Sequence, residues 1–108
     1  MSRYLFIQSQ DPYTEARTQA QYELAGALAA DGHEVRVLLV QNGVIPARRT
    51  AVCAHFDRLC ESSATLLADD LSLQQREIDP AELKPAVKPA AIGIVVDAML
   101  NGDKVIWN

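Results

Sequence analysis

The chain has 108 residues, which suits a single domain over residues 1–108 and leaves no room for a second hydrophobic core. Its formal net charge of -4 and its scattered lysines and arginines argue against a nucleic-acid partner, because phosphate binding needs clustered basic residues. Hydrophobic residues make up 49% of the chain, as in an ordinary globular protein. The sequence shows neither an apolar run long enough to span a bilayer nor an N-terminal signal pattern. These features predict a cytoplasmic globular protein with no membrane partner.

Strand and helix patterns alternate through the first part of the chain. Residues 3–9 are predicted to form a strand, because their apolar residues are consecutive. Asp11 and Pro12 then suit the cap and the first position of a helix, which Gly32 would end. Residues 35–40 are predicted to form a strand that is covered on both faces. The helix would carry an apolar stripe at every fourth residue: Ala16, Ala20, Leu24 and Leu28.

The second part of the chain is less regular, but the alternation continues. The predicted elements are helices over residues 50–60 and 71–76 and strands over residues 64–68, 86–88 and 104–107. The first of these helices would present Val52, Phe56 and Leu59 on one side. Trp107 is predicted to be a packing residue at the sheet or at a subunit contact. A final helix, ended by Gly102, would carry Ile92, Val95, Val96, Met99 and Leu100.

This order of elements predicts an α/β protein in which helices cover both faces of a mainly parallel sheet. In such sheets, ligands bind outside the carboxyl ends of the strands. Three segments would meet there, each directly after a predicted strand. The predicted ligand-binding cleft therefore consists of Ser9, Gln10, Asp11, Gln41, Asn42, Gly43, Asp69 and Asp70.

Asp69 and Asp70 are the chemically most suggestive of these residues. Their predicted main role is to start a helix, because a carboxylate accepts the free N–H groups there and complements the helix dipole. A cation site that includes Asp11 is an alternative, since hard cations take several carboxylate oxygens. No glycine-rich phosphate-binding motif occurs, so the sequence predicts no nucleotide cofactor, and no specific metal site is assigned.

The two cysteines, Cys53 and Cys60, are predicted to be free thiols, as expected in a cytosolic protein. On one helix they would lie about 10.5 Å apart along the axis, beyond the roughly 7 Å limit between the Cα atoms of a disulfide. His55 would point elsewhere on that helix, so a Cys–His nucleophile pair is not supported. Burial as small hydrophobic residues is the simplest interpretation of both thiols.

Four stretches cover nearly the whole chain in a characteristic order: YLFIQSQDP, ELAGALAADGHEVRVLLVQNGV, LLADDLSLQQREI and VKPAAIGIVVDAMLNGDKVIWN. This ordered set resembles the DsrE/DsrF-like family of small sulfur-relay subunits. Together with the alternating pattern, it implies a three-layer α/β/α fold with a five-stranded, mainly parallel sheet. It also implies a homo-oligomer, a trimer or a hexamer, with residues 50–60 at the contact and other sulfur-relay proteins as partners.

One departure from the family's pattern bears on function. In the sulfur-carrying members, the active cysteine lies just after the third strand, and the matching positions here are Ala68 and Asp69. Since a persulfide needs a thiolate, the resemblance implies a non-catalytic binding, scaffold or regulatory subunit associated with sulfur metabolism. Two alternatives stay open: a sulfurtransferase or persulfide carrier that uses Cys53 or Cys60, and a small-ligand or cation-binding module. The second would use Asp11, Asn42, Asp69 and Asp70.

Overall fold

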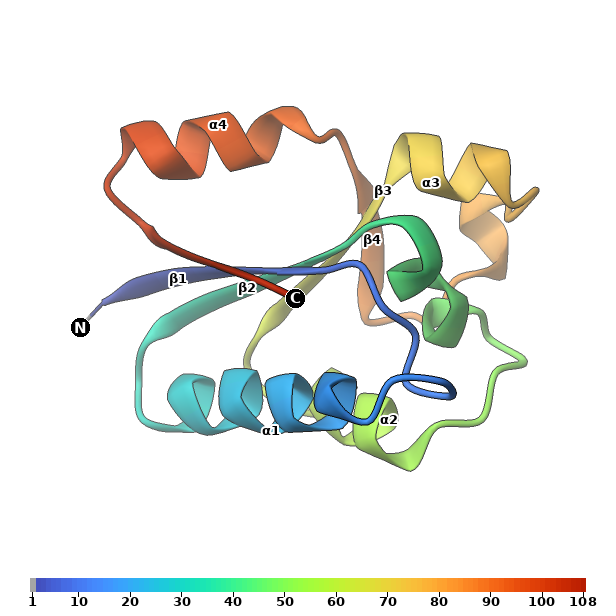
Figure 1. Ribbon diagram of the computed structural model, residues 1–108, viewed down its shortest axis with the longest axis horizontal. Helices are drawn as coiled ribbons and strands as arrows, with labels where there is room; N and C mark the ends of the chain where they lie inside the picture. Colours follow the sequence, from blue (N-terminus) through green and yellow to red (C-terminus); the bar gives the residue numbers. More distant parts are fainter. Residues whose placement is uncertain (1) are drawn as a thin grey trace.

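A five-stranded sheet forms the middle layer of the protein (Figure 1). The computed structural model describes residues 2–108, and its strands are β1 (Arg3–Gln8), β2 (Glu34–Leu39), β3 (Thr65–Asp69), β4 (Val87–Ala90) and β5 (Lys104–Trp107). They stand in the order β4-β3-β2-β1-β5, and every pairing is parallel. The predicted α/β fold with a five-stranded parallel sheet is confirmed.

Helices cover both faces of this sheet. Figure 1 shows α1 and α2 on one face and α3 and α4 on the other. The helices are α1 (Arg17–Ala30), α2 (Ala54–Cys60), α3 (Asp70–Gln75) and α4 (Gly93–Leu100), with short 3₁₀ segments η1 (Gln41–Ala47) and η2 (Pro80–Glu82). None of the helices within residues 2–108 is long and apolar enough to cross a membrane.

The continuous apolar run of β1 follows from its position between β2 and β5. Successive side chains of a strand point to opposite faces of the sheet. Phe6 packs into the core beneath α1 and α2, whereas Leu5 and Ile7 pack into the core beneath α4. Because both faces are covered, every position of the run is apolar and no alternation with polar residues is seen.

The start of α1 differs from the prediction. Asp11 does not cap this helix, which begins only at Arg17. Its Oδ1 instead accepts hydrogen bonds from the backbone N–H groups of Tyr13 at 2.8 Å and Thr14 at 2.9 Å. The carboxylate of Asp11 thus closes a turn in the loop before the helix and does not cap the helix itself. The predicted helix start at Asp11 is therefore wrong.

The buried face of α1 also differs from the predicted stripe. The buried residues are Thr18, Tyr22, Ala25 and Ala29. Ala20 and Leu24, which the prediction placed in the core, are exposed. A helix turns about 100° per residue, so a strict spacing of four drifts around its surface. The many alanines in α1 add little contrast between its faces, and the bulky ring of Tyr22 sets the buried side.

Two other predicted apolar faces are only partly buried. Phe56 and Leu59 of α2 lie in the core as predicted, but Val52 precedes the helix and is 85% exposed. In α4 the buried residues are Val95 and Ala98. The rest of the predicted stripe is exposed: Ile92, Val96, Met99 and Leu100.

Gly43 is held in close contact with β1. A Cβ atom at this position would lie 2.1 Å from the backbone carbonyl oxygen of Gln8, so only glycine fits without a shift of the backbone. This contact seats η1 against the carboxyl end of β1. It therefore positions the segment that follows β2 at the edge where the predicted cleft lies.

Replacing Gly43 is expected to destabilise the fold. Gly43→Ala should lower the free energy of unfolding by about 1–3 kcal/mol, as overpacking does elsewhere. Gly93→Ala is the matched control, because an added Cβ there meets nothing within 4 Å. That change should be neutral or raise stability by up to about 1 kcal/mol. Urea denaturation measures both, and equal midpoints for the two variants would contradict the close contact.

Candidate functional site

A cavity of about 380 Å³ opens at the carboxyl edge of the sheet. Its walls come from the ends of four strands, from α3 and from the residue that precedes α4. The lining residues are Ser9, Val40, Gln41, Asp69, Leu71, Ser72, Gln75, Ile92 and Trp107. The cavity thus lies where ligands bind in parallel α/β sheets.

The cavity also sits at the point where the strand order reverses. The chain proceeds from β1 outward to β4 and then returns to place β5 on the other side of β1. Ser9 and Asn108 tie these two strands together, because the backbone N–H and the hydroxyl of Ser9 both donate to the Asn108 carbonyl at 2.8 Å. Such a switch point leaves a crevice between neighbouring strand ends, and Trp107 forms part of its wall.

Asp69 is the only charged residue that lines the cavity within the described part of the chain. Its side chain is the N-cap of α3 and is 7% exposed. Oδ2 accepts hydrogen bonds from the backbone N–H of Ser72 at 3.1 Å and from the Ser72 hydroxyl at 2.7 Å. The predicted helix-starting role is confirmed for Asp69, whereas Asp70 is exposed in the first turn.

The hydrogen bonds of Asp69 continue into the neighbouring strand connection. The Ser72 hydroxyl accepts a hydrogen bond from the backbone N–H of Gln41 at 2.8 Å. Gln41 has a left-handed backbone with a φ of 49°, which is uncommon for a residue other than glycine. The series from Gln41 through Ser72 to Asp69 therefore joins the end of β2 to the start of α3 and holds this backbone in place.

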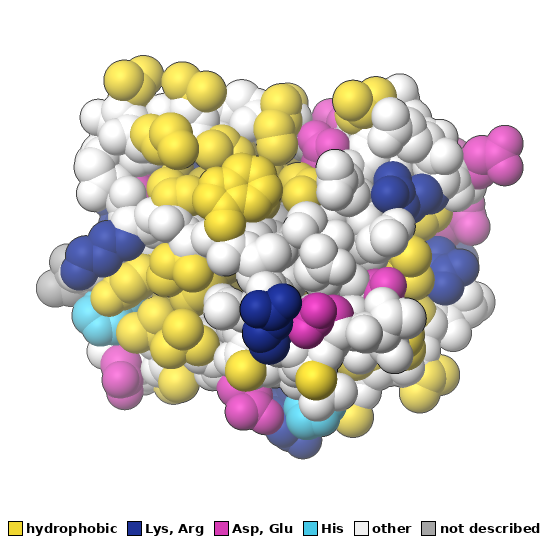
Figure 2. All heavy atoms as spheres, in the orientation of Figure 1, with side chains coloured by type: hydrophobic (Ala, Val, Ile, Leu, Met, Phe, Trp, Pro, Cys, Tyr) yellow, Lys and Arg dark blue, Asp and Glu magenta, His cyan; other side chains and the backbone are white. Residues whose placement is uncertain are grey.

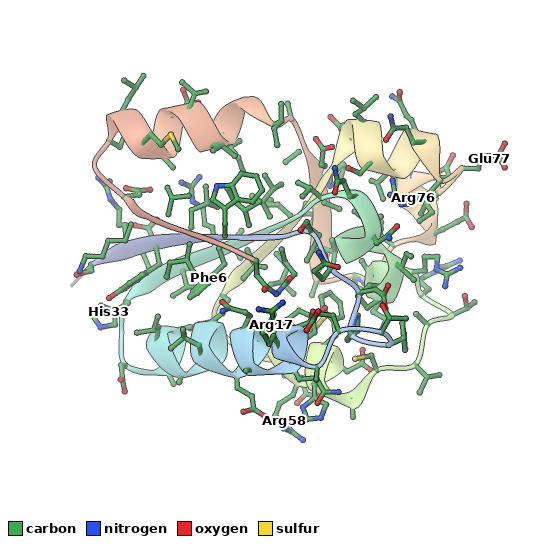
Figure 3. All side chains as sticks on the ribbon, in the orientation of Figure 1. Phe6, Arg17, His33, Arg58, Arg76 and Glu77 are labelled. Carbon is green, nitrogen blue, oxygen red and sulfur yellow. The ribbon has the colours of Figure 1, made fainter. Side chains whose placement is uncertain are left out.

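Asn42 is turned away from the cavity. Its side-chain oxygen accepts hydrogen bonds from Arg76, from Nη2 at 3.0 Å and from Nε at 3.3 Å. Figure 3 shows Arg76 reaching from the end of α3 toward η1. Arg76 is therefore engaged by Asn42 and is not one of the residues that line the cavity.

The structure brings together some of the predicted cleft residues and separates others. Those that line the cavity are Ser9, Gln41 and Asp69. Those that do not are Gln10, Asp11, Asn42, Gly43 and Asp70. The latter follow strand ends in the sequence, but their chain segments turn outward or pack against β1.

Several lining residues were missed by sequence reasoning. Trp107 ends β5, so the same strand-end rule that selected Asp69 would have selected it. Ser72 follows Asp69 at the spacing of a helix cap, which is a second available signal. Leu71, Gln75 and Ile92 carry no signal of this kind, because they reach the cavity only through the packing of α3 and the loop before α4.

The thiols lie on the other side of the sheet. Cys53 is buried before α2, and Cys60 is half-buried at the end of that helix. Both contribute to the core beneath α1 and α2. Neither thiol lines the cavity. Burial raises the pKa of the Cys60 thiol to about 11, against a smaller opposing effect of the Lys84 ammonium.

A smaller cavity of about 270 Å³ lies between α1 and α2. It contains Glu23 and His55, whose Oε1 and Nδ1 atoms are 3.6 Å apart, but no thiol. Figure 3 shows Arg58, another lining residue, on the outer side of α2. Across residues 2–108, no three His, Cys, Asp or Glu side chains are grouped as metal ligands would be.

The fold and the position of the cavity define a three-layer α/β protein with a candidate binding site at the carboxyl edge of a parallel sheet. A sequence model of the DsrE/DsrF-like family matches residues 2–107. The chain therefore belongs to the DsrE/DsrF-like family. A comparison with curated proteins finds no match.

Solved structures show the same fold at low sequence identity. The ychN protein from E. coli superposes with a TM-score of 0.87 at 17% identity, and both chains are covered completely, at 100%. The protein of unknown function MTH1491 from Methanobacterium thermoautotrophicum has a TM-score of 0.84 at 20% identity, also over 100% of both chains. BT1422 from Bacteroides thetaiotaomicron, a conserved protein of unknown function, has a TM-score of 0.80 at 14% identity and covers 99% of this chain and 95% of its own.

The two neighbouring acids are expected to contribute unequally to stability. Asp69→Ala should lower the free energy of unfolding by about 0.5–2 kcal/mol, as the loss of a helix cap does. Asp70→Ala removes an exposed carboxylate one position along and should stay within about 0.5 kcal/mol of the wild type. Calorimetric melting of both variants measures the difference. Equal losses would contradict the capping role of Asp69.

Proposed function

We propose that the protein is a non-catalytic binding or scaffold subunit associated with sulfur metabolism. Family membership supports the link to sulfur relay. The family resemblance assigns the carrier cysteine to the position that Ala68 and Asp69 occupy here. The proposal rests on the burial and hydrogen bonding of Asp69, which lies at the end of β3 and accepts hydrogen bonds from Ser72. A cytoplasmic location is part of the proposal, because both cysteines are free thiols.

Sulfane sulfur cannot be carried at this position. A persulfide forms on a nucleophilic thiolate, and neither a carboxylate nor a methyl group offers one. The Ala68 side chain is completely buried within the sheet, and Oδ2 of Asp69 is committed to the start of α3. The strand end thus supports structure and ligand contact rather than transfer of sulfur.

The alternative of a relocated carrier finds little support in the surroundings of the two thiols. Cys53 is 9% exposed in the core. Cys60 has a raised pKa, so its reactive thiolate is scarce at neutral pH. Lys84 offers limited help, because its ammonium lies 2.6 Å from Oδ1 of Asp57 and is engaged there.

Sulfur loading tests the non-catalytic role directly. After incubation of the folded protein with a persulfide donor at neutral pH, intact-mass spectrometry should detect little or no adduct of about +32 Da, the mass of one sulfur atom. The Cys53→Ser and Cys60→Ser variants serve as controls. A stoichiometric adduct that disappears in one of them would replace the scaffold role by a relocated sulfur carrier.

We further propose that the subunit forms a homo-oligomer. Figure 2 shows hydrophobic side chains gathered over α4 and the adjoining edge of the sheet. The exposed fractions are 52% for Ile92, 58% for Val96 and Met99, 81% for Leu100 and 60% for Trp107. β5 is an edge strand beside this surface, and an unpaired strand edge can accept a second chain. Apolar surface of this kind is typical of protein–protein contacts.

Two matched substitutions distinguish this face from the contact predicted at residues 50–60. Leu100 on α4 and Val52 before α2 are almost equally exposed, at 81% and 85%. Leu100→Lys should lower the mass measured by light scattering at micromolar concentration, whereas Val52→Lys should leave it unchanged. The reverse result would assign the contact to residues 50–60. A monomeric wild type would contradict self-association altogether.

A further inference from the structure

The Asp69 carboxylate has one oxygen without a protein partner. Oδ2 receives both hydrogen bonds from Ser72. Oδ1 receives none from any residue between 2 and 108 and is not among the buried side-chain atoms that lack a partner, so solvent reaches this oxygen although Asp69 as a whole is only 7% exposed and lines the cavity. An ionised carboxylate accepts up to about four hydrogen bonds. Asp69 therefore presents unused acceptor capacity in a confined space.

Among the described residues, the cavity lining offers Asp69 no positively charged side chain. In the part of the chain that the structure describes, no lysine, arginine or histidine lines the cavity. The nearby Arg76 is engaged with Asn42 and with the Ser72 carbonyl. A largely buried carboxylate gains most from a partner that is itself positively charged and donates hydrogen bonds. A cation with N–H groups is thus a favourable partner for the free oxygen of Asp69.

The remaining walls of the cavity suit an organic rather than an inorganic ion. Leu71, Ile92 and Trp107 contribute apolar surface, and the other polar lining residues are uncharged. The indole of Trp107 is 60% exposed, so a flat ligand can lie against it, and a cation can interact with its face. A volume of about 380 Å³ is within the range of small-molecule sites.

We propose that this cavity binds a small organic cation, an amidinium, guanidinium or ammonium group on a flat or apolar body. The cationic N–H groups donate to Oδ1 of Asp69, and the apolar body lies among Leu71, Ile92 and Trp107. The α3 cap is undisturbed, because the ligand and Ser72 use different carboxylate oxygens. This site gives a ligand class to the proposed binding role, yet it does not depend on whether the thiols carry sulfur.

Benzamidine is a suitable probe, since it joins an amidinium to a phenyl ring. Trp107 is the only tryptophan in the sequence, so its fluorescence reports on the cavity wall. We expect benzamidine to produce a saturable change in emission, and the neutral isostere benzamide to bind at least about tenfold more weakly, as the loss of a charge-assisted contact implies. No saturable change up to about 10 mM benzamidine, a range that covers weak binding by so small a ligand, would overturn the proposal.

Matched variants locate the binding charge. Asp69→Asn keeps an oxygen for Ser72 but removes the charge, and should weaken benzamidine binding at least about tenfold. Asp70→Asn changes the net charge equally at an exposed position outside the cavity and should bind as the wild type does. Gln75→Lys adds a competing cation at the cavity wall without altering Asp69 and should also weaken binding. Melting temperatures show that each variant is folded.

Three outcomes would overturn the proposal. The first is equal binding of benzamidine by the Asp69→Asn and Asp70→Asn variants. The second is an equal response of Trp107 to Mg²⁺, which would assign the site to an inorganic ion. The third is a lower mass by light scattering both for the Asp69→Asn variant and for the wild type after benzamidine is added. That result would mean that a lysine or arginine of a second copy fills the cavity. Benzamidine binding that depends on Asp69, found together with stoichiometric sulfur loading, would support the cation site and still refute the non-catalytic role.

Discussion

The parallel pairing of β1 on both of its edges is the constraint from which the rest of the architecture follows. Its neighbours are β2 and β5, so both edges of the strand are hydrogen-bonded and both faces must be covered by helices. α1 and α2 cover one face, and α4 covers the other beside β5. Because all strands run in the same direction, their carboxyl ends meet at one edge. The reversal of strand order at β1 then opens the crevice that becomes the cavity.

Asp69 connects this architecture to the candidate function. The carboxylate ends β3, starts α3 and, through Ser72, holds the left-handed backbone of Gln41. One residue thus stabilises two of the connections that form the cavity wall. A thiolate at the same place would be a poorer hydrogen-bond acceptor for this purpose. Aspartate at this strand end thus joins two chain connections and places a carboxylate in the cavity wall.

The two sides of the sheet differ in their thiols, cavities and exposed apolar surface. The side with α1 and α2 holds both thiols in or against the core, where burial raises the pKa of the Cys60 thiol. The side with α3 and α4 carries the cavity, the exposed indole of Trp107 and the apolar surface of α4. The thiols and the two candidate contact surfaces thus lie on opposite sides of the sheet. Trp107 belongs to both of these surfaces.

The sequence by itself determined the order and type of the strands and helices and the approximate bounds of the strands, and it identified the start of α3, but it did not locate the starts of α1 and α2. These features depend on patterns a few residues long: consecutive apolar residues in β1, a carboxylate at Asp69, and left-handed glycines at Gly32 and Gly102. Only the tertiary structure decided which faces of α1 and α4 are buried. Short-range periodicity does not distinguish an apolar face that meets the sheet from one that stays exposed, as Val96 and Met99 do. The cavity likewise joins Ser9 to Trp107, which are distant in the sequence, and such proximity arises only when β5 pairs with β1.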